Sequence, residues 1–289
     1  MLTRYVLMNF GPNDALYWEA HWCLLGLLAH APEPREIVML TDHPGYFRWF
    51  EGAVRIQALS AGELEEWQGP RRYFFRTLIK SLEFGLTAAP TPEVVVYMDT
   101  DTATRDSLAP LIRQVQAGHV LLDCREYNLY QSGRQGNKAA LRLWQQVGER
   151  DWAGVPIDRA TDMWNTGITA LGRSDAPLIQ AALSVCDALL AAGCEHRLTE
   201  QIAMSAVLTR DGRAREINPR RLEPVVSHYW ANKRGWNEAI TGHLATLRHR
   251  GLSLEEAVAY YRDNPITRPV WVPRTRTWHR WLRVEPLCR

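Results

Sequence analysis

The sequence lacks several features that would mark a secreted, membrane-spanning or nucleic-acid-binding protein. Its five cysteines are scattered, odd in number and without the spacing of metal ligands, which excludes a cysteine-ligated metal motif and favours a reducing compartment. No segment approaches about 18 consecutive apolar residues, and residues 1–13 lack the apolar core of a signal peptide. The net charge of +2 indicates no polyanionic partner. We therefore expect a cytoplasmic protein that binds no nucleic acid.

The chain is long enough for one large domain. It has 289 residues, of which 46% are hydrophobic, and one large α/β domain is expected rather than two small ones. It contains no internal repeats and no low-complexity linker. Residues 265–289 carry six arginines against one glutamate, which gives +5 there and −3 elsewhere. The charge asymmetry is thus confined to the C-terminal segment.

Hydrophobic periodicity predicts alternating strands and helices. Strands are expected at residues 5–10, 36–41, 94–98, 119–123, 163–171 and 224–227. Helices are expected at residues 14–30, 72–86, 138–148, 176–192 and 199–208, with a further helix start at 106–108. In the helix at 72–86, Phe75 is expected to face inward. This βαβ order is typical of an α/β fold.

The most informative segment is Val94-Val95-Val96-Tyr97-Met98-Asp99-Thr100-Asp101, an apolar run that ends in two carboxylates. In open α/β sheets, ligands collect outside the carboxyl ends of the strands, so Asp99 and Asp101 are expected to face a crevice. Two carboxylates at this spacing can share a hard divalent cation such as Mg²⁺ or Mn²⁺, which keeps positions open for phosphate oxygens. A bare Asp-x-Asp also occurs as a turn or a solvated pair, and this alternative stays open.

Four local patterns follow one another along the chain between about residues 5 and 240. They are Asp99-Thr100-Asp101, Asn165-Thr166-Gly167-Ile168, Glu200-Gln201, and the segment from His228 through Lys233 to Trp236. In this order they resemble the nucleotide-sugar glycosyltransferases of the A-type fold, most closely the family-eight-like retaining enzymes. The last segment departs from the family pattern, since Arg234-Gly235 stands where proline is usual.

The resemblance implies a single Rossmann-like domain at residues 1–243 with a mixed, mainly parallel sheet, followed by a helical basic tail at 244–289. It implies metal-dependent transfer of a hexose from a nucleoside-diphosphate sugar, with uridine favoured, to a hydroxyl of a glycan or glycolipid. Asp99, Asp101 and His228 would hold Mn²⁺ or Mg²⁺, and Lys233 would donate to the diphosphate, where negative charge builds as the sugar leaves. The alternative for His228 is a structural histidine.

The resemblance also places residues around the transferred sugar. Asn165 and Gly167 would line the sugar and acceptor side of the cleft, with a loop cap and a packing glycine as the alternatives. Gln201 would stabilise the reaction centre. Asp162 and Glu200 are the carboxylates to consider, because an inverting mechanism needs a general base, whereas a retaining one uses same-face attack with the phosphate accepting the proton. The resemblance favours retention.

Nucleotide contacts are expected from residues that end strands or belong to these motifs, namely Asn9, Asp14, Thr41, Thr100 and Trp236. Ordinary strand-end turns are the alternative for the first three. Arg76, and next Lys80, would brace the first aspartate or the phosphates, because their helix leads into the metal-bearing strand. A charged helical face in solvent is the alternative for these two cations.

The C-terminal segment has the composition of an interfacial membrane helix. Trp271, Trp278 and Trp281 are interleaved with arginines, and residues 274–285 are expected to form a short helix with an aromatic face. Aromatic anchors and a basic face are attracted to anionic lipid, so peripheral contact with the inner face of the membrane is one expectation. Packing on the catalytic domain, or binding a partner chain, is the alternative.

Three other classes of protein share part of this pattern. A haloacid-dehalogenase-like phosphatase also places Asp-x-Asp at a strand end, but it has Thr or Val two residues after the second aspartate, where this chain has Ala103. A nucleotidyltransferase would carry a glycine-rich basic loop after the first strand, which residues 9–14 lack. A non-catalytic derivative that binds carbohydrate or a partner stays open, since the proline of the last motif is missing.

Overall fold

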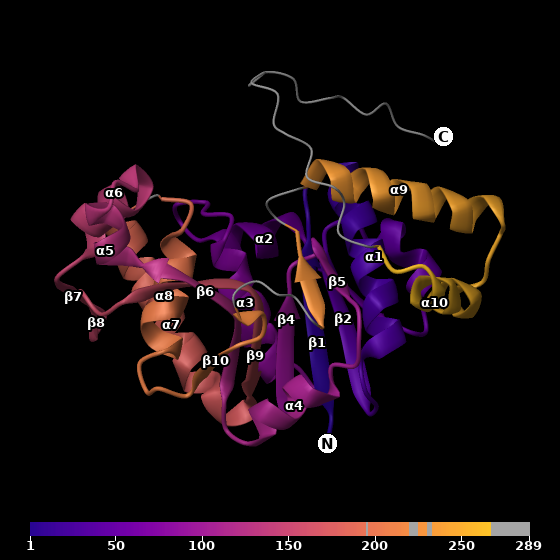
Figure 1. Ribbon diagram of the computed structural model, residues 1–289, viewed down its shortest axis with the longest axis horizontal. Coiled ribbons are helices and arrows are strands. Elements are labelled where there is room, and N and C mark those ends of the chain that lie inside the picture. The colour runs from indigo at the N-terminus through magenta and orange to yellow at the C-terminus, as the bar shows by residue number, and fades with distance from the viewer. Residues whose placement is uncertain (195, 220–224, 230–232, 267–289) are drawn as a thin grey trace.

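A seven-stranded sheet forms the middle layer of a mixed α/β fold (Figure 1). The computed structural model describes residues 1–194, 196–219, 225–229 and 233–266. The strands of the sheet are β1 (Thr3–Asn9), β2 (Arg35–Thr41), β3 (Arg55–Ala58), β4 (Val94–Met98), β6 (Val120–Asn128), β9 (Asp162–Gly172) and β10 (Ala214–Glu216). Their order across the sheet is β10-β6-β9-β4-β1-β2-β3.

All strands of this sheet point the same way except β9. Strand β1 is parallel to β2 and β4, β2 is parallel to β3, and β10 is parallel to β6, whereas β9 is antiparallel to both β4 and β6. The expected mixed, mainly parallel sheet is therefore confirmed. Because β1 and β4 are parallel neighbours, Asn9 and Asp99 lie at the same edge of the sheet.

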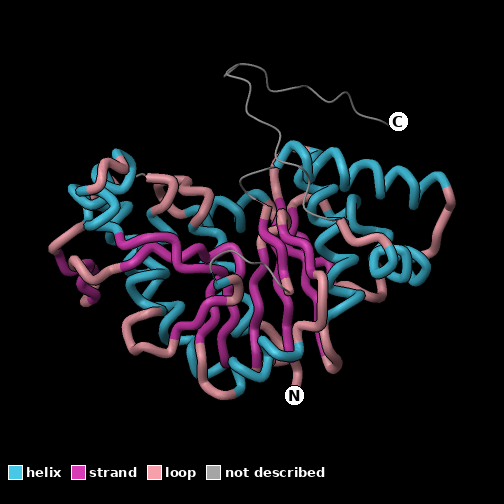
Figure 2. The backbone as a smooth tube through the Cα atoms, viewed as in Figure 1, coloured by secondary structure: helices cyan, strands magenta, loops and turns pink. Residues whose placement is uncertain are grey.

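Helices cover both faces of the sheet, as Figure 2 shows. One face carries α1 (Asp14–His30), α4 (Ala109–Gln116), α9 (Lys233–His249) and α10 (Leu254–Asp263). The other carries α2 (Ala61–Gln68), α3 (Arg76–Thr87), α6 (Lys138–Val147), α7 (Ala176–Ala191) and α8 (Thr199–Leu208). In β1, Tyr5 and Leu7 point into the first core, and Val6 and Met8 into the second. Burial on both faces explains why the strands read as continuous apolar runs.

A short ribbon lies beside the carboxyl end of β4. It pairs β5 (Thr102–Thr104), which directly follows the Asp-x-Asp segment, with β11 (Val226–His228). Helix α1 approaches β5 closely because Gly26 has no side chain. A Cβ atom there would stand 2.6 Å from the Tyr261 hydroxyl and 3.2 Å from the Thr104 amide nitrogen. This contact fixes α1 against the segment that leaves the aspartates.

The remaining elements are peripheral to the sheet. They are the 3₁₀ helices η1 (Pro44–Phe50) and η2 (Arg173–Asp175), helix α5 (Leu129–Arg134), and the hairpin of β7 (Arg150–Trp152) and β8 (Val155–Ile157). Among the residues that the structure describes, the stretch Arg173–Ala191 is long and apolar enough to cross a membrane by length and composition. It comprises η2 and α7, whose Ile179, Val185 and Leu189 are buried in the core. Core helices commonly have this composition.

Most predicted elements are present, and α1 and α8 have the predicted bounds. Helix α3 begins at Arg76 rather than at residue 72, because the chain turns at Arg72, whose φ of 48° lies in the left-handed region. Phe75 therefore precedes the helix and is exposed, so the prediction that it faces inward was wrong. The strand predicted at 224–227 is β11, shifted towards His228.

The C-terminal part of the described chain is helical and packs on α1. Ile240 and Leu244 of α9, with Tyr261 of α10, belong to the same core as α1. The expected boundary between residues 243 and 244 falls inside α9. The helix predicted at 274–285, with its tryptophans, lies outside the described residues.

Arg4 of β1 is buried and joins three segments of the chain. Its guanidinium pairs with Glu36 of β2 at 2.6 Å and donates to the carbonyl oxygens of Gly85 (2.6 Å) and Ala88 (2.8 Å) at the end of α3. We expect Arg4→Met to lower the free energy of unfolding by about 3 kcal/mol, because both carbonyls lose a charged donor and Glu36 keeps only its 3.3 Å contact with Arg55. Urea denaturation measures this change. Arg234→Met, at an exposed ion pair, should cost less than about 1 kcal/mol, and equal losses would contradict the role of Arg4.

Candidate metal centre

Two aspartates and a histidine meet at the carboxyl end of β4. Asp99 and Asp101 follow this strand directly, and His228 ends β11. The pairing of β11 with β5 sets His228 opposite Thr102, the residue after Asp101. His228 Nε2 is therefore 3.3 Å from Asp101 Oδ1 and 3.8 Å from Asp99 Oδ2. We call these three residues the Asp-Asp-His cluster.

The donor atoms of this cluster fit a divalent cation. One ligand atom from each residue lies within 4.8 Å of the others. Two carboxylates suit Mg²⁺ and Mn²⁺, and the imidazole nitrogen adds a ligand that transition metals prefer. Tyr97 donates a 2.8 Å hydrogen bond to Asp99 Oδ1, which leaves Oδ2 directed at His228. Asp99, Asp101 and His228, the three ligands predicted from the sequence, are thus brought together.

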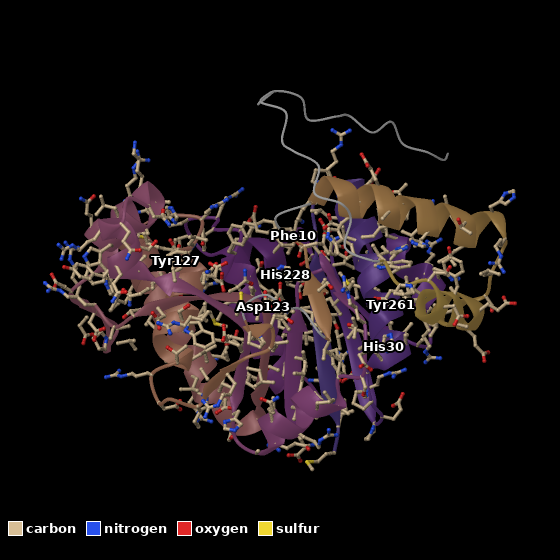
Figure 3. The ribbon with its side chains drawn as sticks, in the orientation of Figure 1. Phe10, His30, Asp123, Tyr127, His228 and Tyr261 are labelled. Carbon is tan, nitrogen blue, oxygen red and sulfur yellow. The ribbon has the colours of Figure 1, made fainter. Side chains whose placement is uncertain are left out.

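A third aspartate orients the histidine. Asp123 Oδ2 lies 2.7 Å from His228 Nδ1, and Asp123 Oδ1 accepts from Asn218 Nδ2 at 2.6 Å. Figure 3 labels Asp123 and His228 close together above the middle of the sheet. A carboxylate on one ring nitrogen fixes the ring and makes the other nitrogen a better ligand. Asp123 was not predicted from the sequence, although it follows the apolar residues 120–122 of β6 much as Asp99 follows β4.

Gly167 lets the strands close around the cluster. The Asp99 amide donates to the Gly167 carbonyl at 2.6 Å, which carries the pairing of β4 and β9 one step beyond the strand end. A Cβ atom on Gly167 would stand 2.4 Å from His228 Cε1 and 2.5 Å from Asp99 Oδ2. These distances leave no room for a side chain. Gly167 is thus packed directly against His228 and Asp99, as the alternative interpretation of a packing glycine expects.

The charges of the cluster are coupled. Burial raises the pKa of Asp99 to about 6, and the neighbouring Asp101 adds to the rise. Burial acts in the same direction on Asp101, but His228 and Lys233 outweigh it and hold the pKa of Asp101 below its usual range. Burial alone would lower the pKa of His228, and Asp101 and Asp123 instead raise it well above its usual range. A divalent cation would therefore replace a proton on this imidazole.

Lys233, the first residue of α9, lies at the edge of the cluster. Its Nζ atom is 3.0 Å from Asp101 Oδ2 and 3.1 Å from Glu19 Oε2 of α1. The Lys233 side chain is 42% exposed, whereas that of Glu19 is only 1% exposed. Lys233, predicted to act on the diphosphate, thus lies beside the candidate metal ligands and is partly exposed to solvent. Glu19 was not predicted, because nothing in a helix rich in Trp and Leu distinguishes it from a surface glutamate.

Two residues predicted to lie near the sugar, Asn165 and Gln201, both bind Glu126 of β6. Gln201 Nε2 donates to Glu126 Oε2 at 2.9 Å, and Asn165 Nδ2 donates to Glu126 Oε1 at 3.4 Å. Asn165 Oδ1 in turn accepts from the Gly167 amide at 3.0 Å. Glu126 lies at the register shift between Arg125 and Tyr127 of β6 and was not predicted from the sequence. It joins two motifs that are far apart in the chain.

Glu200 is a buried carboxyl group beside this network. It is 3% exposed and accepts a 2.9 Å hydrogen bond from the Thr166 hydroxyl. Burial raises the pKa of Glu200 to about 8, the Thr166 bond opposes the rise, and the charge of Asp99 adds to it. Glu200 therefore keeps its proton to a higher pH than a carboxyl group in water does.

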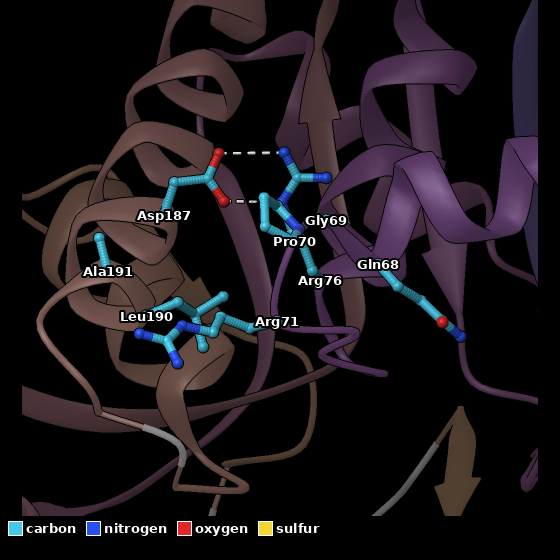
Figure 4. A pocket seen from close by; sticks show the side chains of 8 residues that line it. All are labelled: Gln68, Gly69, Pro70, Arg71, Arg76, Asp187, Leu190 and Ala191. Carbon is cyan, nitrogen blue, oxygen red and sulfur yellow. Dashed lines mark hydrogen bonds and ion pairs between the residues drawn. The ribbon is translucent and has the colours of Figure 1, made fainter.

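Arg76 and Lys80 bind carboxylates away from the cluster. Arg76 pairs with Asp187 of α7 at 2.7 Å and donates to the Trp67 carbonyl at 2.7 Å. Figure 4 shows Arg76 and Asp187 on the wall of a pocket of about 470 Å³. Lys80 pairs with Glu83 one turn along α3. This face of α3 meets α7 rather than Asp99.

Of three other residues predicted to belong to the site, two lie in an ion pair or in the core, and one lies in the loop between Asp99 and Asp101. Asp162, at the start of β9, pairs with Arg125 at 2.8 Å. Trp236 is buried in the core and stacks on Tyr229 with ring centroids 4.4 Å apart. Thr100 is half-buried between the two aspartates. Of the three, only Thr100 adjoins the Asp-Asp-His cluster in the chain.

The residues predicted to contact ribose or base divide into two groups. Thr41 Oγ1 accepts from the His43 amide at 3.1 Å within the turn after β2, and Asp14, the first residue of α1, accepts from the Tyr46 hydroxyl of η1. Asn9 differs, because it is 4% exposed and its Nδ2 has no hydrogen-bond partner among the described residues. This buried, unpaired amide lies at the carboxyl end of β1, the same sheet edge as Asp99.

We expect Gly167→Ala to weaken Mn²⁺ binding roughly tenfold or more, because the new methyl group would push apart Asp99 and His228. Electron paramagnetic resonance of free Mn²⁺ during a titration measures the affinity. Gly172→Ala is the matched control on the same strand, since its Cβ would meet no atom closer than 3.5 Å. Equal affinities in the two variants would contradict the packing of Gly167 against a metal site.

Glu200 makes stability depend on pH with a defined sign. A folded-state pKa of about 8 against an ordinary value of 4.5 means that the folded protein keeps a proton that the unfolded chain loses. This contribution is complete at low pH and is lost as pH rises through about 8. The free energy of unfolding of wild type should therefore fall relative to Glu200→Gln between about pH 5 and 8. Parallel curves from denaturant titrations would rule this out.

Comparison with known proteins gives matches at the level of structure. No family model matches the chain, and no curated protein does. Among the solved structures that match is mouse xyloside xylosyltransferase 1 in its apo form. The two chains are 12% identical, the alignment covers 75% of this chain and 86% of that one, and the TM-score is 0.49.

Proposed function

We propose that this protein is a metal-dependent glycosyltransferase that moves a hexose from a nucleoside-diphosphate sugar to a hydroxyl group of a glycan or glycolipid. The observation that carries the proposal is the Asp-Asp-His cluster at the carboxyl end of β4, with the Lys233 ammonium beside it. Mn²⁺, or Mg²⁺, bound there would neutralise charge on the diphosphate. Uridine is the base that the motif resemblance favours.

The residues around the cluster have complementary tasks in this proposal. Asp99, Asp101 and His228 would hold the cation, and Asp123 keeps His228 Nε2 turned towards it. Lys233 would donate to the leaving diphosphate as a mobile charge. Because its side chain is 42% exposed, it can reach a ligand from its present position without unfolding α9.

The carboxyl groups near the sugar side support retention. Glu200 is 3% exposed and accepts the 2.9 Å hydrogen bond from the Thr166 hydroxyl, so it has little access to an attacking hydroxyl group. Asp162 is held by Arg125 at 2.8 Å. Each carboxyl group considered for an inverting mechanism is thus already held by a neighbouring side chain. A same-face attack, in which the phosphate accepts the acceptor's proton, needs no carboxylate base.

Other parts of the proposal concern the donor and the location of the protein. The unpaired Asn9 amide, at the same sheet edge as Asp99, suits a carbonyl or hydroxyl of the nucleoside. Asn165 and Gln201, both bound to Glu126, would face the sugar. Peripheral membrane contact through the Arg- and Trp-rich segment, in a cytoplasmic protein, would bring the site to lipid-linked acceptors.

Calorimetric titration of uridine and guanosine diphosphates, with Mn²⁺ and with chelator, tests the proposal. We expect wild type to bind one nucleotide only with Mn²⁺, and Asp101→Ala to lose that binding while its far-ultraviolet spectrum is unchanged. Asp211→Ala, at an exposed ion pair with Arg213, is the control and should bind as wild type does. Absence of binding by wild type would favour a phosphatase or a non-catalytic carbohydrate-binding protein.

A further inference from the structure

Glu19 is a buried carboxylate that the proposed chemistry leaves without a task. It lies on the face of α1 that meets β5, one turn before Cys23, whose Sγ atom is 3.2 Å from the Thr102 hydroxyl. Its side chain is 1% exposed, and its Oε1 atom has no hydrogen-bond partner among the described residues. An ionised carboxylate in such a place is costly unless a cation accompanies it.

The cation that accompanies it is shared with a metal ligand. Lys233 Nζ is 3.1 Å from Glu19 Oε2 and 3.0 Å from Asp101 Oδ2, so one ammonium group bridges both carboxylates. Asp101 is the member of the Asp-Asp-His cluster closest to His228 Nε2, at 3.3 Å. Lys233 therefore holds an oxygen of one of the three candidate metal ligands.

A divalent cation and Lys233 compete at Asp101. A doubly charged ion bound to this carboxylate would weaken its attraction for the ammonium and repel the ammonium directly. The Lys233 ammonium then needs a second anion close by, or it must move into solvent. Glu19 is that anion, because it already contacts Nζ and lies on a helix fixed against β5 by the close approach at Gly26.

We propose that Glu19 is a positioning residue that receives the Lys233 ammonium when a divalent cation binds Asp101, and so keeps it within reach of the diphosphate. The inference rests on the proposed function for the diphosphate, but the exchange of partners at Asp101 requires only the metal. In this scheme Glu19 contacts neither metal nor substrate and acts solely through Lys233.

A double-mutant cycle on Mn²⁺ affinity tests this dependence, with titration followed by electron paramagnetic resonance. In Glu19→Gln the ammonium rests on Asp101 alone, so Mn²⁺ should bind roughly fivefold more weakly. In Lys233→Met the competitor is gone, and Mn²⁺ should bind more tightly than in wild type. Adding Glu19→Gln to Lys233→Met should then change nothing, because the unpaired carboxyl group of Glu19 would already be protonated.

Glu238→Gln, which removes an exposed carboxylate from the Arg234 ion pair of the same helix, is the control and should match wild type. If Glu19→Gln does not fold, Glu19→Asp, which keeps the charge but shortens its reach, should show a smaller loss of Mn²⁺ affinity. The role of Glu19 would be overturned if Glu19→Gln lowered Mn²⁺ affinity equally in the wild type and in Lys233→Met. It would also be overturned if Glu19→Gln lowered Mn²⁺ affinity in neither.

Uridine and guanosine diphosphate affinity at saturating Mn²⁺ separates this inference from the proposed function. We expect Lys233→Met and Glu19→Gln each to weaken binding, and the double variant to bind no more weakly than Lys233→Met. If wild type binds Mn²⁺ but neither nucleotide, the proposed function fails while the Mn²⁺ cycle still decides the role of Glu19. If wild type binds no Mn²⁺, both proposals fail.

Discussion

The imidazole of His228 lies among three carboxylates, and the geometry of the site depends on it. Asp99 and Asp101 approach one ring nitrogen, while Asp123 approaches the other. The ring is in this place because β11 pairs with β5, two segments more than 100 residues apart in the chain. A single antiparallel ribbon of three residues per strand therefore brings His228 to the two aspartates that precede β5.

Negative charge exceeds positive charge around this ring. Asp99, Asp101, Asp123 and Glu19 are held within contact distance of His228 or Lys233. Burial, and next the charge of Asp101, raise the pKa of Asp99, so this carboxyl group takes up a proton more readily than it would in water. A bound divalent cation relieves both effects at once. The fold thus stores an unfavourable charge arrangement that suits cation binding.

The sequence predicts the local parts of this arrangement better than the distant ones. Helix α1 and the strand before Asp99 follow from periodicity and from runs of β-branched residues. Arg76 was expected near Asp99 because its helix leads into the strand that carries Asp99, but its guanidinium pairs with Asp187 of α7 instead. Asp123, Glu19 and Glu126 were not predicted, and although Asp123 follows an apolar run as Asp99 does, each acts on a partner at least 39 residues away. Pairs at such separations are set by the tertiary fold.

The site also bears on how the last helices are held. His228 and Lys233 flank the start of α9, and their bonds to Asp101 and Asp123 tie this part of the chain to β4 and β6. Any ligand that binds these residues in the folded protein alone stabilises the fold by mass action. A cation at Asp101 would thus hold β11 to the sheet while releasing Lys233 from it. Because Glu19 keeps the lysine on α1, the packing of α9 does not depend on the bond that is lost.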